Sequence, residues 1–405
     1  MLRKTLIAFM VLSLGVLPVL AADNWYVFVF NGLSGQLVRI DATGSQTTFD
    51  LALPENSFVS GSAMALSADG NRIAYCPNTP GTESAQGTST LIVRDLAANA
   101  NVLEIPLGPS IGCQVSDQSL SGDGTQVAVS LVRYFPGDTN TDTSNPMWHV
   151  TIYDINSGSV IHELSADSSE VAAAGVIMGT ALMPDVRYFA NNQIIFAEVP
   201  WGIGGSPEWR AFTWDLNSST LTLDETGRWG KSGLSAQSTT GELVWLDSDP
   251  ALAASDPGGP IPAFNIVRLA DKTGQERAIY HNGERILIDT AFINGGAQLG
   301  LTWMTPFDID NPEQQMTSWV ALERDGSVTP LGEGAAYVRM VDGPGGAAIF
   351  QLHVDETAFA QSFALDYLAN GATTRLWEAA DMGWELVGAT PAPVAGNLSA
   401  FPAIG

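Results

Sequence analysis

The sequence predicts an all-β protein in which small antiparallel sheets repeat along the chain and close into a ring. Three observations support this fold class. A strand motif that ends in Asp recurs about every 54 residues, which is the length of four strands with their loops. Tight-turn dipeptides lie between successive motifs. Beyond the N-terminal segment, no stretch has the pattern of a long amphipathic helix.

The recurring motif is a run of β-forming residues followed by Asp and a turn. It first occurs at residues 36–41, QLVRID, and again at residues 90–95, TLIVRD. The Asp residues that end the motif are Asp41, Asp95, Asp154, Asp215, Asp271, Asp325 and Asp366. Because each unit contains one motif, we expect seven units.

A second marker alternates with the first and consists of a tight turn between two apolar strands. Asp69-Gly70 and Asp123-Gly124 are turns of this kind, with residues that tolerate positive φ. Each unit thus supplies an inner strand, a hairpin turn and three further strands. A four-stranded sheet cannot bury both faces alone, so the units must stack around an axis. The prediction is a seven-bladed β-propeller of four-stranded antiparallel blades.

The two ends of the chain suggest how the ring closes. Residues 25–30 have the pattern of a second strand without its inner strand, and residues 384–389 that of an inner strand without its blade. Pairing of these N- and C-terminal strands would complete one blade. The tail, residues 397–405, could instead compete for the second-strand position of the closing blade, and the sequence leaves both alternatives open.

Two of the turns resemble those of a known group of propellers. Residues 67–74, SADGNRIA, and 121–128, SGDGTQVA, resemble the serine, any residue, aspartate-glycine turn of WD repeats and of TolB-like periplasmic propellers. Residues 152–158, IYDINSG, resemble their third strand and following turn. The resemblance covers two or three blades. It implies a propeller that binds proteins, and it assigns no catalytic residue.

The N-terminus has the pattern of a secretory signal. Arg3 and Lys4 precede a short apolar run, and small residues precede Asp23. We expect residues 1–22 to be a signal peptide and residues 23–405 to form a single β-propeller domain. The apolar run is short for a membrane span. The expected location is therefore the periplasm or the cell exterior, without membrane insertion.

The charge and the cysteines restrict the partners and the compartment. The chain has 43 acidic and 17 basic residues and a formal net charge of −26, which repels phosphate backbones and argues against nucleic acid. We expect a monomer that binds a protein or peptide. The two cysteines, Cys76 and Cys113, lie at strand ends of neighbouring predicted blades, and an exported protein keeps disulfides. They are predicted to form one.

Catalytic motifs are missing from the sequence. The four His are scattered, and neither an HExxH zinc motif nor a Gly-x-Ser-x-Gly elbow occurs. The first hypothesis is therefore a non-enzymatic binding protein. One alternative is a propeller-type enzyme, a lactonase or glycan lyase, with an acidic metal site in the central channel. The other is a carbohydrate-binding propeller. A broad apolar patch would favour protein binding, and an acidic channel mouth would favour the metal-dependent enzyme. A flat aromatic strip would favour the carbohydrate-binding propeller.

Long loops are predicted on a single face of the ring. They join the second and third strands of five blades and define what we call the long-loop face: residues 77–89, 132–146, 199–208, 247–262 and 303–316. Loop length beyond what a connection needs is typical of binding surfaces. The aromatic residues predicted to contact a partner there are Tyr134, Trp201, Trp303 and Phe307.

One of these loops has the pattern of a calcium site. Asp138, Asn140, Asp142 and Ser144 alternate oxygen-bearing side chains, which hard cations require. The loop departs from the usual pattern because His149 stands where a bidentate Glu is expected, and the glycine of the sixth position is replaced. Calcium is thus a hypothesis for residues 138–144, and no other cofactor is expected.

Overall fold

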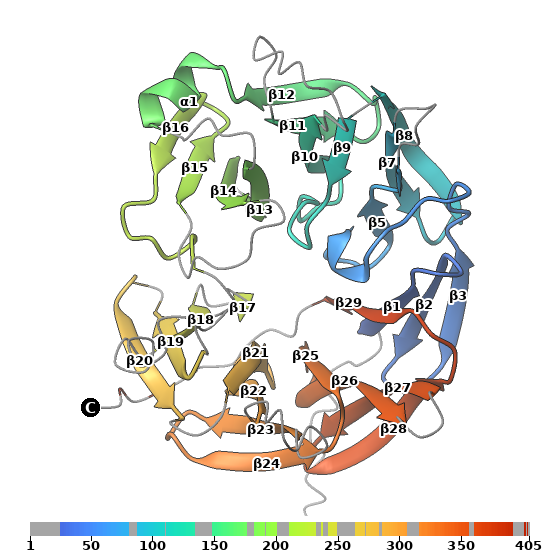
Figure 1. The fold of residues 1–405 in the computed structure, drawn as a ribbon, viewed down its shortest axis with the longest axis vertical. Helices are drawn as coiled ribbons and strands as arrows, with labels where there is room; N and C mark the ends of the chain where they lie inside the picture. The colour runs from blue at the N-terminus through green and yellow to red at the C-terminus, as the bar shows by residue number, and fades with distance from the viewer. Residues whose placement is uncertain are drawn as a thin grey trace, which may run out of the picture.

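The computed structural model describes most of residues 25–403. The segments outside this description are 81–86, 110, 134–147, 176–181, 191, 201–209, 232–235, 238–241, 249–263, 272, 283–285, 306–315, 356–359, 392–400 and 402. The described residues form seven antiparallel sheets arranged as blades around a common axis (Figure 1). The predicted fold class is confirmed.

Each blade has four main strands, which follow one another from the axis outward. Blade 1 contains β29 (Trp384–Thr390), β1 (Tyr26–Asn31), β2 (Gln36–Asp41) and β3 (Gln46–Asp50), and blade 2 contains β4 (Met64–Leu66), β5 (Arg72–Tyr75), β7 (Thr88–Asp95) and β8 (Ala100–Pro109). Blade 3 contains β9 (Ile111–Gln114), β10 (Gln126–Arg133), β11 (Trp148–Asp154) and β12 (Val160–Ser165), and blade 4 contains β13 (Leu182–Ala190), β14 (Gln193–Pro200), β15 (Ala211–Asp215) and β16 (Thr220–Leu223).

The remaining blades follow the same order. Blade 5 contains β17 (Ala236–Gln237), β18 (Leu243–Asp247), β19 (Ile266–Ala270) and β20 (Glu276–His281), and blade 6 contains β21 (Ile286–Ile293), β22 (Gln298–Met304), β23 (Thr317–Glu323) and β24 (Val328–Glu333). Blade 7 contains β25 (Tyr337–Gly343), β26 (Gly346–Asp355), β27 (Ala360–Ala369) and β28 (Ala372–Ala379). Additional short elements are β6 (Asn78–Thr79), which pairs with β7, a 3-10 turn (Gly61–Ala63) and α1 (Ser169–Ala174).

Blade 1 is closed by both ends of the chain. β1 pairs antiparallel with β2 on one side and with β29 on the other, and Tyr26 lies opposite Thr390 while Asn31 lies opposite Trp384. Closure by terminal strands is thus confirmed, and β1 occupies the second-strand position for which the tail was the alternative. Phe401, from the tail, is buried instead in a cluster shared by blades 5 and 6.

Alternating residues of β1 explain why the blades stack. Val27 and Val29 pack in a cluster with blade 7, whereas Phe28 and Phe30 pack in a cluster with blade 2. Successive side chains of a strand point to opposite faces, so a strand such as β1 that is apolar throughout buries both faces. The hydrophobic effect therefore drives neighbouring blades together, and the core lies between the blades.

The repeated Asp has a structural role in the turn between the third and fourth strands. In blade 6, the Oδ1 atom of Asp325 accepts hydrogen bonds from the backbone N–H and the hydroxyl of Ser327, at 2.9 and 2.6 Å. These bonds hold the pKa of Asp325 below its ordinary value. Equivalent bonds from residues two to four positions ahead reach Asp41, Asp95, Asp154, Asp215 and Asp271. Asp366 instead contacts Gln351 and Arg375.

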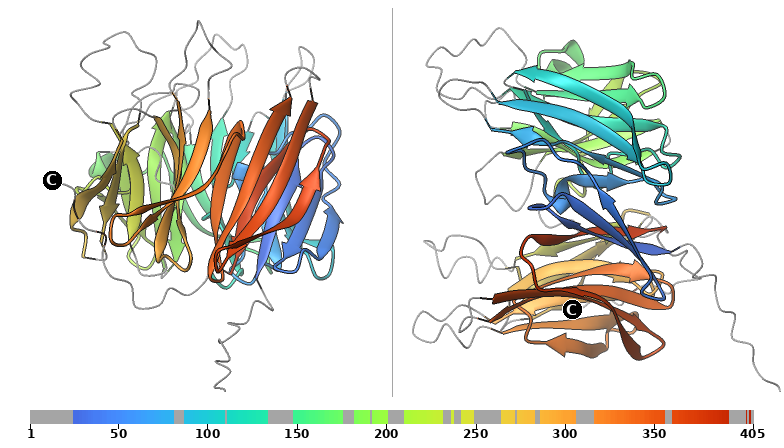
Figure 2. Two further views of the ribbon diagram at one scale, coloured as in Figure 1. Left: turned by 90° about the horizontal axis from the view of Figure 1, so that it is seen from below. Right: turned by 90° about the vertical axis from the view of Figure 1, so that its right-hand side faces the viewer.

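The alternating strand directions sort the connections onto two faces. Turns between the first and second strands and between the third and fourth strands lie on one face, which we call the hairpin face. Connections from second to third strands, and from one blade to the next, lie on the long-loop face. Figure 2 shows the blades edge-on between these two faces. No helix in the described segments is long and apolar enough to span a membrane.

Candidate functional site

Most of the predicted binding residues lie outside the described part of the chain. These are Tyr134, Trp201, Phe307, Asp138, Asn140, Asp142 and Ser144. Trp303 is described, and it is buried in β22, where its ring stacks on that of Tyr280 with centroids 5.8 Å apart. Trp303 therefore belongs to the core of blades 5 and 6 rather than to an exposed rim.

The two cysteines meet at the boundary between blades 2 and 3. Cys76 and Cys113 are joined as a disulfide, with Cα atoms 5.8 Å apart, within the ordinary range for such a bond. The side chain of Asn78, from blade 2, crosses the same boundary: its amide donates to the Cys113 carbonyl oxygen at 3.2 Å, and its Oδ1 atom accepts from the Cys113 N–H at 3.3 Å. A covalent bond and two hydrogen bonds thus join these blades.

Three exposed apolar side chains lie on neighbouring segments of the long-loop face beside blade 1. Leu33 is 77% exposed, Met382 57% and Phe58 56%, the three highest values among the large apolar residues described. They come from the β1–β2 turn, the β28–β29 connection and the β3–β4 connection. We call these three residues the closing-blade patch.

Asn31 holds two of the segments that carry this patch. Its buried amide donates to the Asp381 carboxylate and to the Met382 carbonyl at 3.1 and 3.0 Å. Its Oδ1 atom accepts from the backbone N–H groups of Leu33 and Ser34 at 2.9 and 3.0 Å. A single side chain therefore fixes the β1–β2 turn against the β28–β29 connection, although these segments lie at opposite ends of the chain.

The third segment is held equally closely. The backbone of Phe58 pairs with that of Asn78 at 3.0 and 3.2 Å. Glu385 of β29 accepts from the Ser60 hydroxyl and the Gly61 N–H at 2.7 and 2.8 Å. A Cβ placed on Gly32 would lie 3.2 Å from the carbonyl oxygen of Val59, so this segment touches the β1–β2 turn. The patch is thus fixed by hydrogen bonds before any partner binds.

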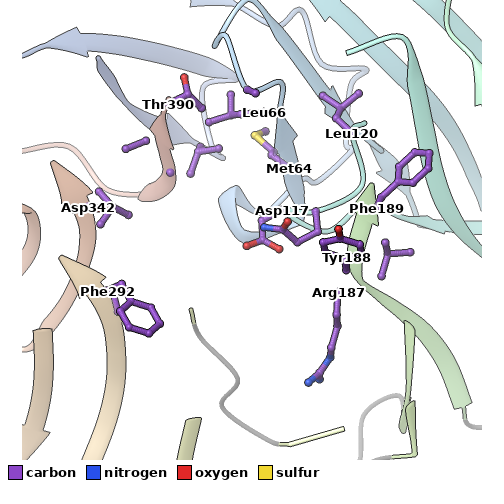
Figure 3. Close-up of a pocket in the computed structure, with 18 of the residues that line it drawn as sticks. Met64, Leu66, Asp117, Leu120, Arg187, Tyr188, Phe189, Phe292, Asp342 and Thr390 are labelled. Atoms are coloured by element: carbon purple, nitrogen blue, oxygen red, sulfur yellow. The ribbon is translucent and has the colours of Figure 1, made fainter. Parts of the chain in front are cut away.

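A cavity of about 620 Å³ occupies the central channel. Its walls are inner strands and their hairpin turns, so it extends to the hairpin face (Figure 3). Apolar and aromatic side chains form much of the lining: Met64, Leu66, Leu120, Tyr188, Phe189, Trp229 and Phe292. Charged groups also reach it, namely Asp117, Asp185, Arg187, Arg339 and Asp342.

The two guanidinium groups of the cavity are engaged with neighbouring groups. Arg187 donates to Asp185 at 3.2 Å and to the carbonyl oxygens of Trp229 and Lys231 at 2.9 and 2.8 Å. Arg339 of blade 7 lies 3.9 Å from the carboxylate of Asp289 in blade 6. Arg339 therefore joins blades 6 and 7, and Arg187 joins blade 4 to the connection that leads to blade 5.

Burial raises the pKa of several channel carboxyl groups. The pKa of Asp342 is raised to about 7 by burial, against the effect of the N–H groups of Gly295 and Gly343, which donate to it at 2.8 and 2.9 Å. Burial likewise raises the pKa of Asp289 to about 6 and that of Asp185 above its ordinary value, although Arg339 and Arg187 oppose the shift. Nonetheless, no cluster of three His, Cys, Asp or Glu side chains that could hold a metal occurs among the described residues.

Sequence reasoning missed both the patch and the channel groups. A usable signal existed for the channel, because Asp185, Arg187, Arg339 and Asp342 interrupt inner strands that are otherwise apolar. A charged side chain in such a strand is costly to bury unless it is paired or hydrated, so these residues indicate a polar channel. The patch had no such signal, since isolated exposed apolar residues are common.

Comparison with known proteins identifies the fold. No protein-family model and no curated protein sequence matches the chain. An acylaminoacyl peptidase solved in complex with a chloromethyl ketone is 13% identical, with a TM-score of 0.50, and the match covers 87% of this chain. The chain spans half the length of that peptidase.

Two further structures are similar in fold. The β-propeller domain of the Trilobed protease from Pyrococcus furiosus is 12% identical over 87% of this chain and 91% of its own, with a TM-score of 0.49. TolB from Acinetobacter baumannii is 12% identical over 76% of this chain and 63% of its own, with a TM-score of 0.39. The chain is a β-propeller, and its resemblance to WD-repeat and TolB-like propellers holds at the level of the fold.

Proposed function

We propose that this protein is an exported, non-enzymatic β-propeller that binds a protein or peptide through its long-loop face. The observation that carries the proposal is the closing-blade patch, in which Leu33, Met382 and Phe58 are the most exposed large apolar side chains described. Their segments contact one another through backbone and side-chain hydrogen bonds. A rigid apolar group of this kind is typical of a docking surface.

The energetics favour a macromolecular partner. Burying a Leu, Met or Phe side chain contributes about 1.5–3 kcal/mol, so the three side chains of the patch together supply enough free energy for a binding hot spot. Because the patch is held in place by Asn31 and Glu385, a partner would order little of this surface on binding. The net charge of −26 favours a partner with basic groups around its apolar contact.

Export is part of the same proposal and rests on residues 1–22. The basic start, the apolar run and the small residues before Asp23 support a cleaved signal. N-terminal sequencing of the protein recovered from the periplasm or medium of an expressing bacterium tests this. Cleavage near residue 22 is expected, and an intact Met1 in a cytoplasmic protein would contradict export.

The binding experiment compares the two faces of the propeller. The patch variant carries both Leu33→Asp and Met382→Asp and so places charge in the closing-blade patch. The matched control carries both Val160→Asp and Val328→Asp. These two valines are 49% and 39% exposed and lie beside turns of the hairpin face. A partner recovered from native extract is then titrated against each purified variant by surface plasmon resonance. We expect the patch variant to bind at least about tenfold more weakly.

The control variant is expected to bind as the wild type does. Far-UV circular dichroism and thermal melting establish that both variants keep the wild-type fold. Unchanged binding by a folded patch variant would contradict the proposal. Loss of binding by the hairpin-face variant alone would instead place the interface on the opposite face.

A further inference from the structure

The central cavity lies apart from the closing-blade patch, and its charges are unbalanced. Four carboxyl groups, Asp117, Asp185, Asp289 and Asp342, stand in or beside it against two guanidinium groups, those of Arg187 and Arg339. Arg187 is occupied by Asp185 and two carbonyl oxygens, and Arg339 faces Asp289. Among the described residues, no guanidinium pairs with the remaining two carboxyl groups, those of Asp117 and Asp342.

Those two carboxyl groups stand on different walls of one cavity. Asp117 comes from the segment between β9 and β10 of blade 3, and Asp342 from β25 of blade 7 (Figure 3). Within the described part of the chain, neither forms an ion pair, and Asp117 is exposed to solvent. Asp342 uses its Oδ1 atom for two backbone N–H groups. Both groups can therefore accept a ligand that carries positive charge.

Aromatic side chains line more than one wall of the cavity (Figure 3). The Tyr188 and Trp229 rings lie with centroids 5.7 Å apart, and Phe292 lines the cavity from blade 6. Aromatic faces attract organic cations through the ring quadrupole and pack against apolar ligand atoms. A volume of about 620 Å³ is in the range of small-molecule sites.

We propose that the central cavity binds an organic cation, a small molecule with an ammonium or guanidinium group on an apolar or aromatic body. The cationic group would contact Asp117 or Asp342, and the body would pack on Tyr188, Trp229 and Phe292. A bare metal ion is disfavoured because it needs several converging oxygens, and no suitable cluster occurs in the described residues. An organic anion is also disfavoured, because the excess of carboxylates in the cavity would repel it.

Three indole probes of nearly equal size separate charge from shape. Tryptamine carries an ammonium group, tryptophol replaces it with a hydroxyl, and indole-3-acetate carries a carboxylate. Each is titrated into the purified protein by isothermal calorimetry at pH 8, where Asp342 is ionised. We expect tryptamine to bind at least about tenfold more tightly than tryptophol. Indole-3-acetate should bind most weakly.

The variants test which carboxyl groups supply the preference. Asp117→Asn, Asp342→Asn and their combination should reduce the preference for tryptamine over tryptophol, with the combined variant the closest to none. Glu276→Gln, an equal change of charge at the exposed start of β20, should leave the preference intact. Thermal melting establishes that each variant is folded.

Three outcomes would overturn the inference: no tryptamine binding at millimolar concentration, equal affinity for all three probes, or an unchanged preference in the folded double variant. None of these bears on the proposed function, because the patch lies on the long-loop face and the titration contains no protein partner.

Discussion

Replacing Phe401 with Ala tests whether the C-terminal tail stabilises the ring. The side chain of Phe401 is fully buried in the cluster of blades 5 and 6, among residues that include Ile279 and Leu299. The Arg324 guanidinium lies 4.2 Å from its ring centroid, and Arg277 donates to its carbonyl oxygen at 2.9 Å. Phe401 accordingly lies beside β20, the strand that contains Arg277.

The expected loss follows from burial and from the cation–π contact. Truncation of a buried Phe to Ala removes about 3–5 kcal/mol, a range that includes the cavity left behind. We expect about 3 kcal/mol for Phe401, because it comes from a chain end that can relax. Phe401→Leu retains most of the burial and removes the cation–π contact with Arg324, so it should lose only about 1 kcal/mol.

Calorimetry measures these differences. An unfolding entropy of about 2.1 cal/mol/K per residue, over a propeller of about 380 residues, converts 3 kcal/mol into a drop in Tm of about 4 °C. Phe401→Leu should fall by about 1 °C on the same basis. A Tm unchanged by Phe401→Ala would show that burial of the Phe401 side chain does not stabilise the folded ring.

Four further predictions concern the channel, the disulfide, the patch and the calcium hypothesis. Burial raises the pKa of Asp342 from 3.8 to about 7, so the contribution of this carboxyl group to stability is complete below pH 4 and is lost as the pH rises through 7. In urea denaturation, the wild type should lose about 1–2 kcal/mol of stability relative to Asp342→Asn between pH 4 and 8. Parallel pH profiles of the two proteins would contradict this. The double variant with Cys76→Ser and Cys113→Ser opens a loop with a sequence separation of 37 and should lower the free energy of unfolding by about 4 kcal/mol. Two titratable thiols in the unreduced wild type would show that the disulfide does not form. Asn31→Ala leaves two backbone N–H groups without their acceptor, so it should lower the free energy of unfolding in urea by about 1–3 kcal/mol and weaken partner binding. A wild-type stability together with a wild-type affinity would show that Asn31 does not hold the patch. Calcium at residues 138–144 predicts a higher Tm in millimolar calcium than in chelator, and equal Tm values would exclude a site that binds only the folded state.

The fold was predictable because its signals are local. In six of the seven blades, the Asp at the end of the third strand accepts hydrogen bonds from the next few residues, so the sequence marks these turns where they occur. The incomplete blade at residues 25–30 pointed to closure because a strand apolar on both faces needs neighbours on both sides. Neither inference required knowledge of contacts between distant blades.

The candidate sites depended on such distant contacts. Trp303 follows the same aromatic pattern as an exposed rim residue, and only the position of Tyr280 in the neighbouring blade shows that it is buried. The patch joins Leu33 to Met382, which are separated by nearly the whole chain and meet through Asn31. The charge excess in the channel likewise appears only when carboxyl groups from several blades surround one axis.

Site-specific photocrosslinking tests the central claim, that a partner docks on the long-loop face at the closing-blade patch. A benzophenone amino acid is placed at Leu33 or Met382 in two variants, and at Val160 or Val328 beside the hairpin face in two others. Each variant is irradiated in native extract. We expect the variants at Leu33 and Met382 to crosslink to one shared partner and the variants at Val160 and Val328 to crosslink to none. A partner captured only from Val160 or Val328 would contradict docking at the closing-blade patch.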